Sequence, residues 1–305
     1  MDEVRVLSPA TVSNVVCGFD CLGFALEAPC DEMAVRKIDE RVIRIINRDD
    51  YGLPSDPAKN VAGVALRAMI DEAQRDHGFE IEITKHIKPG SGIGSSSASS
   101  CGALAAANRL LDDRFSNLDL VEFAMEGEKL ASGSKHADNV APCIFGGFTL
   151  VRSTEPLDIV PLDFPPLFAT VIHPQIEIKT SEARAILPEM VPLKDAVRNW
   201  SNLGSFVAAL SKGDLELLSR SMVDTIVEPA RKSLIPKFDE IISAGREAGA
   251  LGGGISGSGP SIFMLCQSAN TAENVESAMR EVYSKTGIDF NIYVSKIHPE
   301  GVRFI

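Results

Sequence analysis

Pro89-Gly-Ser-Gly-Ile-Gly-Ser-Ser-Ser-Ala-Ser-Ser100 is a Gly- and Ser-rich segment that lies between two regular ones. Before it, residues 79–87 alternate apolar and polar side chains, which is the period of a half-buried strand. After it, residues 98–111 are rich in Ala and Leu and contain no Pro, which predicts a buried helix with Ser95 and Ser96 at its N-cap. A glycine-lined turn that opens a helix presents backbone N–H groups and the positive end of the helix dipole, and this arrangement suits a phosphate.

Two familiar phosphate loops do not fit this segment. No Lys follows any of its glycines, as a P-loop requires. The spacing of Gly90, Gly92 and Gly94 is not that of a dinucleotide-binding loop, and residues 119–131 resemble a second helix rather than the next strand of a βαβ unit. A capped helix with a flexible entry and no ligand is the alternative to a phosphate site.

The composition is that of an ordinary globular protein. A length of 305 residues favours two domains. The net charge of −12 argues against a nucleic-acid surface or an anionic-membrane surface. We find no leader with a basic and then an apolar part, and no apolar run of about 18 residues, so neither a signal peptide nor a membrane span is predicted.

The six cysteines form no C-x-x-C pair, so Cys17 and Cys21 are interpreted as reduced core thiols rather than half a metal site, and a cytoplasmic location follows.

Two strongly polar residues interrupt the apolar segment at residues 12–26. They are Asn14 and Asp20. A buried polar group needs a partner, so each of them is either tied to the backbone, as in an Asx turn, or faces a ligand. The residues by themselves leave both interpretations open.

A second concentration of polar groups follows later in the chain. Glu128 precedes His136 by eight residues, and His136-Ala-Asp138-Asn139 stands before a Pro and the turn Gly146-Gly147. A lone His or Glu would mean little, but this crowding indicates a functional site.

Together these segments resemble a known family. Pro89 to Ala98 is similar to the phosphate-loop signature of the kinases named after galactokinase, homoserine kinase, mevalonate kinase and phosphomevalonate kinase, the GHMP kinases. Other segments match that family in order, and several resemble the homoserine kinases in particular: Pro9–Asp20, Glu128–Gly147, Thr180–Pro188, Glu228–Arg231 and Gly252–Ser261.

The resemblance implies a fold and an activity. The expected fold is α+β, a two-domain GHMP kinase fold with the active site in the cleft between an ATP-binding domain at 1–160 and a ferredoxin-like C-terminal domain at 161–305. The expected activity uses ATP and Mg²⁺ to phosphorylate the side-chain hydroxyl of L-homoserine, a step toward threonine, in a homodimer. The alternatives are another kinase of the family, such as a mevalonate-type enzyme, or a relative that senses ATP and a metabolite without turnover.

The resemblance also implies which residues hold ATP and the metal ion. Ser96 and Glu128 match the Mg²⁺ ligands, although a third serine, Ser97, stands where many members have Ala. Asn60 is a candidate on the adenosine side, with a helix N-cap as the competing interpretation. The phosphates would be held by Pro89, Gly90, Ser91, Gly92, Ile93, Gly94, Ser95, Ser96, Ser97 and Ala98.

The remaining motifs imply an amino-acid site. Asp138 matches the residue regarded as the catalytic base in mevalonate kinases, whereas in homoserine kinases the need for a base is disputed and Asn139 matches a residue near the reacting hydroxyl. A mechanism without a base is chemically reasonable, since phosphoryl transfer depends mostly on positioning and charge stabilisation. The arginine fork suits a planar carboxylate. The substrate-binding candidates are Asn14, Asp20, His136, Thr180, Arg184 and Arg231.

Overall fold

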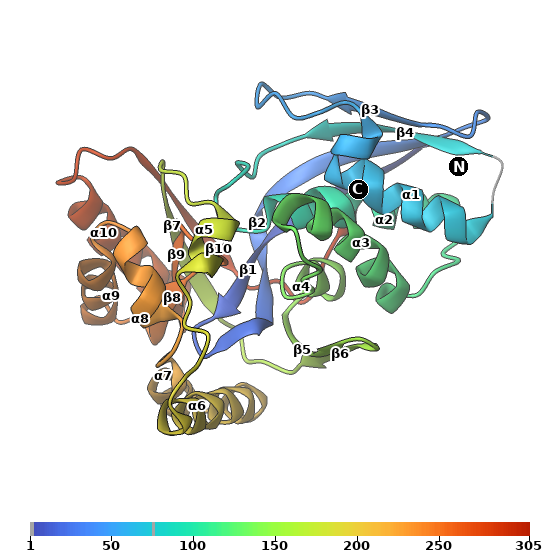
Figure 1. The fold of residues 1–305 in the computed structure, drawn as a ribbon. Coiled ribbons are helices and arrows are strands. Elements are labelled where there is room, and N and C mark those ends of the chain that lie inside the picture. The colour runs from blue at the N-terminus through green and yellow to red at the C-terminus, as the bar shows by residue number, and fades with distance from the viewer. Residues whose placement is uncertain (1–2, 75–76) are drawn as a thin grey trace.

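The computed structural model describes residues 3–74 and 77–305, which form two β-sheets with helices packed against them (Figure 1). The large sheet has the order β11-β1-β2-β4-β3, with β5 beside β2 and β6 beside β5. Strands β3 and β4 pair in parallel and the other neighbours are antiparallel. Its strands are β1 (Glu3–Val15), β2 (Gly18–Ile38), β3 (Ile43–Asn47), β4 (Gly78–Thr84), β5 (Phe148–Thr154), β6 (Leu157–Leu162) and β11 (Arg303–Phe304).

The helices of the first half cover one face of this sheet (Figure 1). Helix α2 is buried on nearly all sides, which its Ala, Ser and Gly residues permit because small side chains let neighbouring elements approach closely. Helix α3 begins with a capping box in which Ser116 and Asp119 bond each other's backbone N–H groups. The elements are η1 (Pro57–Lys59), α1 (Val61–Ala73), α2 (Ser95–Leu110), α3 (Asn117–Ser132) and α4 (Val140–Phe145).

The second sheet has the order β10-β7-β9-β8, with every pair antiparallel. Helices α9 and α10 pack against it, so its elements follow the β-α-β-β-α-β order of a ferredoxin-like sheet, and the predicted α+β class is confirmed. The strands are β7 (Phe168–Pro174), β8 (Gly252–Ile255), β9 (Ile262–Cys266) and β10 (Phe290–Lys296). The helices are α5 (Thr180–Ala185), α6 (Leu193–Lys212), α7 (Leu215–Ser221), α8 (Glu228–Arg231), η2 (Lys232–Leu234), α9 (Phe238–Glu247) and α10 (Ala269–Tyr283).

The two sheets share a hydrophobic core. Phe24 of β2 packs edge-on against Phe263 of β9, with ring centroids 5.6 Å apart. The chain passes from the large sheet to the small one between Leu162 and Phe168, and β11 brings it back to pair with β1. The division into 1–160 and 161–305 stays a prediction. None of the helices within the described ranges is long and apolar enough to cross a bilayer.

Candidate active site

A pocket of about 350 Å³ lies where the phosphate loop meets elements of both halves of the chain. Most of the residues singled out from the sequence line it: Asn14, Asp20, Pro89, Gly90, Gly92, Gly94, Ser95, Ser96, Glu128, His136, Asp138, Asn139, Thr180, Arg184 and Arg231. Ser91, Ile93, Ser97 and Ala98 are buried behind this lining. Asn60 does not line the pocket. Its side chain caps α1, accepting from the Ala62 N–H at 3.0 Å, and donates to the Pro54 carbonyl at 2.8 Å. Its geometry therefore gives the adenosine role no support.

The phosphate loop has a backbone that only glycine adopts easily. Gly92 and Gly94 have φ angles of +80° and +72°, and a Cβ on Gly92 would lie 2.5 Å from the carbonyl oxygen of Gly259. The Gly-Ser loop before β9 holds the phosphate loop in place, since Ser256 Oγ donates to the Gly92 carbonyl at 2.7 Å and Ser261 Oγ donates to the Ser91 carbonyl at 2.6 Å. Two segments far apart in sequence thus form one wall of the pocket.

The predicted N-cap of the loop helix was wrong. Helix α2 begins at Ser95, its N-cap residue is Gly94, and no side chain caps it. Ser95 Oγ instead donates to the Ile87 carbonyl at 2.8 Å. Because serine caps are absent, the first-turn N–H groups of α2 are not taken up by a capping side chain, which suits an anion.

Glu128 presents a buried carboxylate beside the start of α2. It is 7% exposed and accepts a hydrogen bond from Ser97 Oγ at 2.9 Å. Burial raises the pKa of Glu128, and hydrogen bonds from Ser96 and Ser97 oppose that rise. Within the described residues its hydrogen-bond partners are hydroxyls rather than cations, and a site of one carboxylate, one hydroxyl and substrate phosphates fits Mg²⁺. Ser96 lines the pocket whereas Ser97 is fully buried, so Ser96 is the better placed metal ligand.

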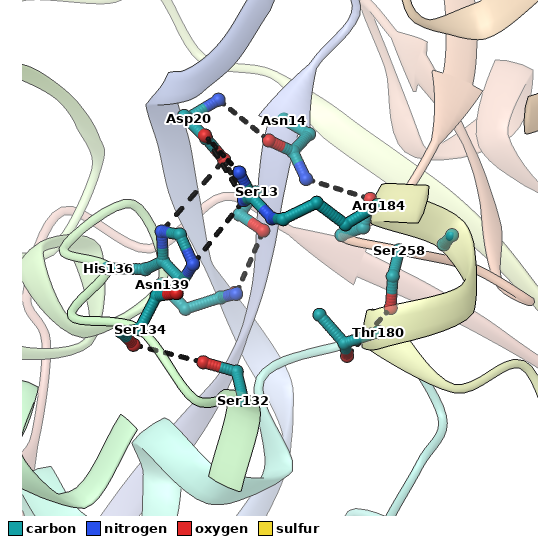
Figure 2. A network of polar contacts seen from close by, with 12 residues as sticks. Ser13, Asn14, Asp20, Ser132, Ser134, His136, Asn139, Thr180, Arg184 and Ser258 are labelled. Carbon is teal, nitrogen blue, oxygen red and sulfur yellow. Dashed lines mark hydrogen bonds and ion pairs between the residues drawn. The ribbon is translucent and has the colours of Figure 1, made fainter. Parts of the chain in front are cut away.

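Another part of the pocket lining carries an ion pair. Arg184 binds both carboxylate oxygens of Asp20, with N–O distances of 2.9–3.1 Å (Figure 2). His136 lies against both, with Nε2 at 3.3 Å from Arg184 and Nδ1 at 4.0 Å from Asp20. The pKa of His136 is lowered, chiefly by burial. The negative charge of Asp20 opposes this shift, and the positive charge of Arg184 adds to it. The lowered pKa favours the neutral form of the His136 imidazole.

Backbone contacts fix the residues around this pair. Asn14 accepts from the Asp20 N–H and donates to the Gly257 carbonyl, both at 2.8 Å, so it is tied to the backbone and also lines the pocket. Arg231 is 3% exposed, stacks on Phe19 and donates to the Gly257 carbonyl at 3.3 Å. Thr180 Oγ1 lies 3.3 Å from Ser258 Oγ. The loop at 257–258 is thus the common anchor of the residues around the ion pair.

Asp138 and Asn139 also line the pocket. Asp138 is 4% exposed, and burial, followed by the charges of Asp20 and Glu128, raises its pKa to about 7. Asn139 accepts from Thr11 Oγ1 and donates to Ser13 Oγ, both at 2.8 Å. A carboxyl group that titrates near neutral pH can exchange a proton with a hydroxyl in reach.

Sequence reasoning missed Ser13, Lys85 and Ser258, which all line the pocket. Ser258 lies in a Gly-Ser segment already expected near the site. Lys85 is a polar residue of the alternating strand before the phosphate loop, and that position was the only signal for it. Lys85 forms an ion pair with Asp31, and the side chains of these two residues are at most 1% exposed. The Lys85 ammonium also donates to the Ser95 carbonyl at 2.8 Å.

Lys85→Met is expected to lower the free energy of unfolding by about 3–5 kcal/mol, because Asp31 is then buried without its cation. Urea unfolding measures the change, and Lys59→Met at an exposed position is the control. Adding Asp31→Asn should recover much of the loss, since an amide oxygen still accepts from the backbone N–H groups of His86 and Ile87. Unchanged stability of Lys85→Met would contradict the structural role.

Comparisons with known proteins agree with this geometry. Residues 60–147 match the family described as GHMP kinases N terminal domain, and residues 206–285 match GHMP kinases C terminal. A homoserine kinase of Chlorobium phaeobacteroides is 43% identical, and the similarity spans the whole of both chains. The chain belongs to the homoserine kinase family.

Other members of the homoserine kinase family show the same extent of similarity. A homoserine kinase of Pyrococcus abyssi is 42% identical over 96% of both chains. The crystal structure of a homoserine kinase from Cytophaga hutchinsonii is 48% identical, with a TM-score of 0.96 over 100% of this chain and 98% of that one. The protein is therefore an ATP-dependent small-molecule kinase with the GHMP kinase fold.

Proposed function

We propose that the protein transfers the γ-phosphoryl group of Mg·ATP to the side-chain hydroxyl of L-homoserine, giving O-phospho-L-homoserine and ADP. The observation that carries the proposal is the Asp20–Arg184 pair, which lies in the same pocket as the phosphate loop. A carboxylate and a guanidinium side by side are complementary to an α-amino acid, which carries one ammonium and one carboxylate. Mevalonate and galactose carry no ammonium, so Asp20 would have no such partner in them.

In this proposal the amino acid is held at its charged end. Asp20 accepts from the substrate ammonium, while Arg184 and Arg231 bind its carboxylate through their guanidinium forks. His136 and Asn14 keep Asp20 and Arg184 in place by the contacts described above. Thr180 contributes a hydroxyl from the start of α5.

The phosphates are held at the other end by the loop backbone and the N-terminus of α2. Ser96 and Glu128 would hold Mg²⁺, which when bound neutralises charge on the phosphates. Asp138 and Asn139 line the pocket between these two ends. Their roles are to receive the hydroxyl proton and to orient the attacking oxygen, respectively.

We also propose that the enzyme acts as a homodimer in the cytoplasm. All six cysteines are free thiols, which supports a reducing compartment. Light scattering measures the oligomeric state and cell fractionation the location.

ADP release with Mg·ATP and a panel of L-homoserine, L-threonine, L-serine, mevalonate and galactose tests the activity. Turnover should be well above background with L-homoserine and exceed that with every other acceptor. Preferred turnover of mevalonate or galactose would remove the roles given to Asp20, Arg184 and Arg231. ATP binding without turnover of any acceptor would favour the sensing alternative.

A further inference from the structure

Ser13 of β1 contacts Asn139, one of the two residues proposed to act on the acceptor hydroxyl. Its side chain is 1% exposed and lines the pocket. Its Oγ accepts from Asn139 Nδ2 at 2.8 Å, as Figure 2 shows, while Asn139 Oδ1 accepts from Thr11 Oγ1 at 2.8 Å. The Ser13 carbonyl oxygen also accepts from the Gly257 N–H at 3.1 Å. Strand β1 therefore holds the Asn139 amide at both ends.

Two hydroxyls by themselves could hold an amide either way round, since each hydroxyl both donates and accepts. In the structure the NH₂ group of Asn139 faces Ser13 and its carbonyl oxygen faces Thr11, so Ser13 Oγ accepts and Thr11 Oγ1 donates. Removing the Ser13 hydroxyl would leave this NH₂ group without its partner on β1.

We propose that Ser13 is a positioning residue for phosphoryl transfer, which fixes the orientation of the Asn139 amide toward the acceptor hydroxyl. Because an amide has two N–H donors and Ser13 takes one, the second N–H remains for the acceptor oxygen. The inference rests on the proposed function for the role of Asn139.

Three variants of Ser13 distinguish the effect on kcat of losing the hydroxyl from the effect of changing the side-chain volume. Ser13→Ala and Ser13→Cys are each expected to lower kcat about 10-fold, the loss of one buried hydrogen bond, while KM for ATP stays unchanged. Ser13→Thr keeps a hydroxyl and should retain most of the activity. Ser8→Ala, a fully buried serine on the same strand outside the pocket lining, is the matched control. Thermal melting establishes that each variant is folded.

A double-mutant cycle tests whether Ser13 acts through Asn139. If it does, adding Ser13→Ala to Asn139→Ala lowers kcat little further, because the partner is already gone. Independent, multiplicative losses would overturn the proposal, and so would a Ser13→Cys enzyme with wild-type kcat. The cycle is measured with the acceptor that the wild type turns over best, or with ATP hydrolysis by water if none is used. A failure of L-homoserine as substrate would therefore count against the proposed function and not against this inference.

Discussion

Glu128→Gln is expected to lower kcat about 10²- to 10⁴-fold, because stabilisation by a bound cation is worth several kcal/mol and an amide is a weaker ligand than a carboxylate. The same change is expected to raise the melting temperature. Burial raises the pKa of Glu128, so the fold disfavours the ionised carboxylate that Gln replaces. The pKa of Glu128 is higher in the folded protein than in the unfolded one, so the stability of the wild type falls as the pH rises through the folded-state pKa. The rise in melting temperature that Glu128→Gln produces should therefore be largest in alkaline buffer and vanish in acid.

The measurements are kcat against Mg²⁺ concentration and melting curves in mildly acidic and mildly alkaline buffer. Glu122→Gln makes the same substitution at an exposed position of α3 and is the control. A Glu128→Gln enzyme with wild-type kcat at every Mg²⁺ concentration would remove Glu128 from the metal site. A lower melting temperature in alkaline buffer would contradict the stabilisation.

Arg184→Ala is expected to lower kcat/KM for L-homoserine about 10²- to 10⁴-fold, because a charge-assisted hydrogen bond contributes roughly 1.5–3 kcal/mol and the guanidinium makes two. KM for ATP should change little, since the hydrogen bonds of Arg184 go to Asp20 and His136 rather than to the phosphate loop. Arg184→Lys keeps the positive charge but lacks the two parallel N–H donors of the guanidinium, so its kcat/KM should lie between those of the wild type and Arg184→Ala.

Steady-state kinetics with each substrate varied in turn measures both constants. Arg198→Ala, an exposed arginine of α6 that does not line the pocket, is the control. An equal loss of affinity for ATP and L-homoserine in Arg184→Ala would show a general disruption of the pocket. In that case the carboxylate-binding role would be wrong.

Local patterns explain what the sequence could predict. The alternation before the phosphate loop became β4, and the Ala-rich stretch after it became α2. The N-cap of α2 was predicted at Ser95 and Ser96 but is Gly94. The error arose because glycine has no capping side chain, whereas the three residues after it are serines. Neighbouring residues of a helix point about 100° apart, so Ser96 lines the pocket while the next residue, Ser97, is buried and donates to Glu128.

Contacts between distant residues could not be predicted in the same way. The Asp20–Arg184 pair joins residues 164 positions apart, and Asp31 and Lys85 are 54 apart. Each residue gives an ordinary polar signal in its own segment, and only the pairing of β1, β2 and β4 brings Asp31 to Lys85. The family motifs supplied the identity of the amino-acid site, whereas its internal ion pair came from the structure.

The return of the chain to β1 makes the small sheet and its helices a long insertion within the first half. The insertion is anchored where it leaves, after Leu162, and where it comes back, since the His298 N–H donates to the Ala25 carbonyl and the Ile305 N–H to the Arg5 carbonyl. A fragment that ended near residue 160 would lack β11 and would expose Phe24, whose ring packs on Phe263. Both the hydrophobic core around Phe24 and the pocket lining therefore draw on the two halves of the chain.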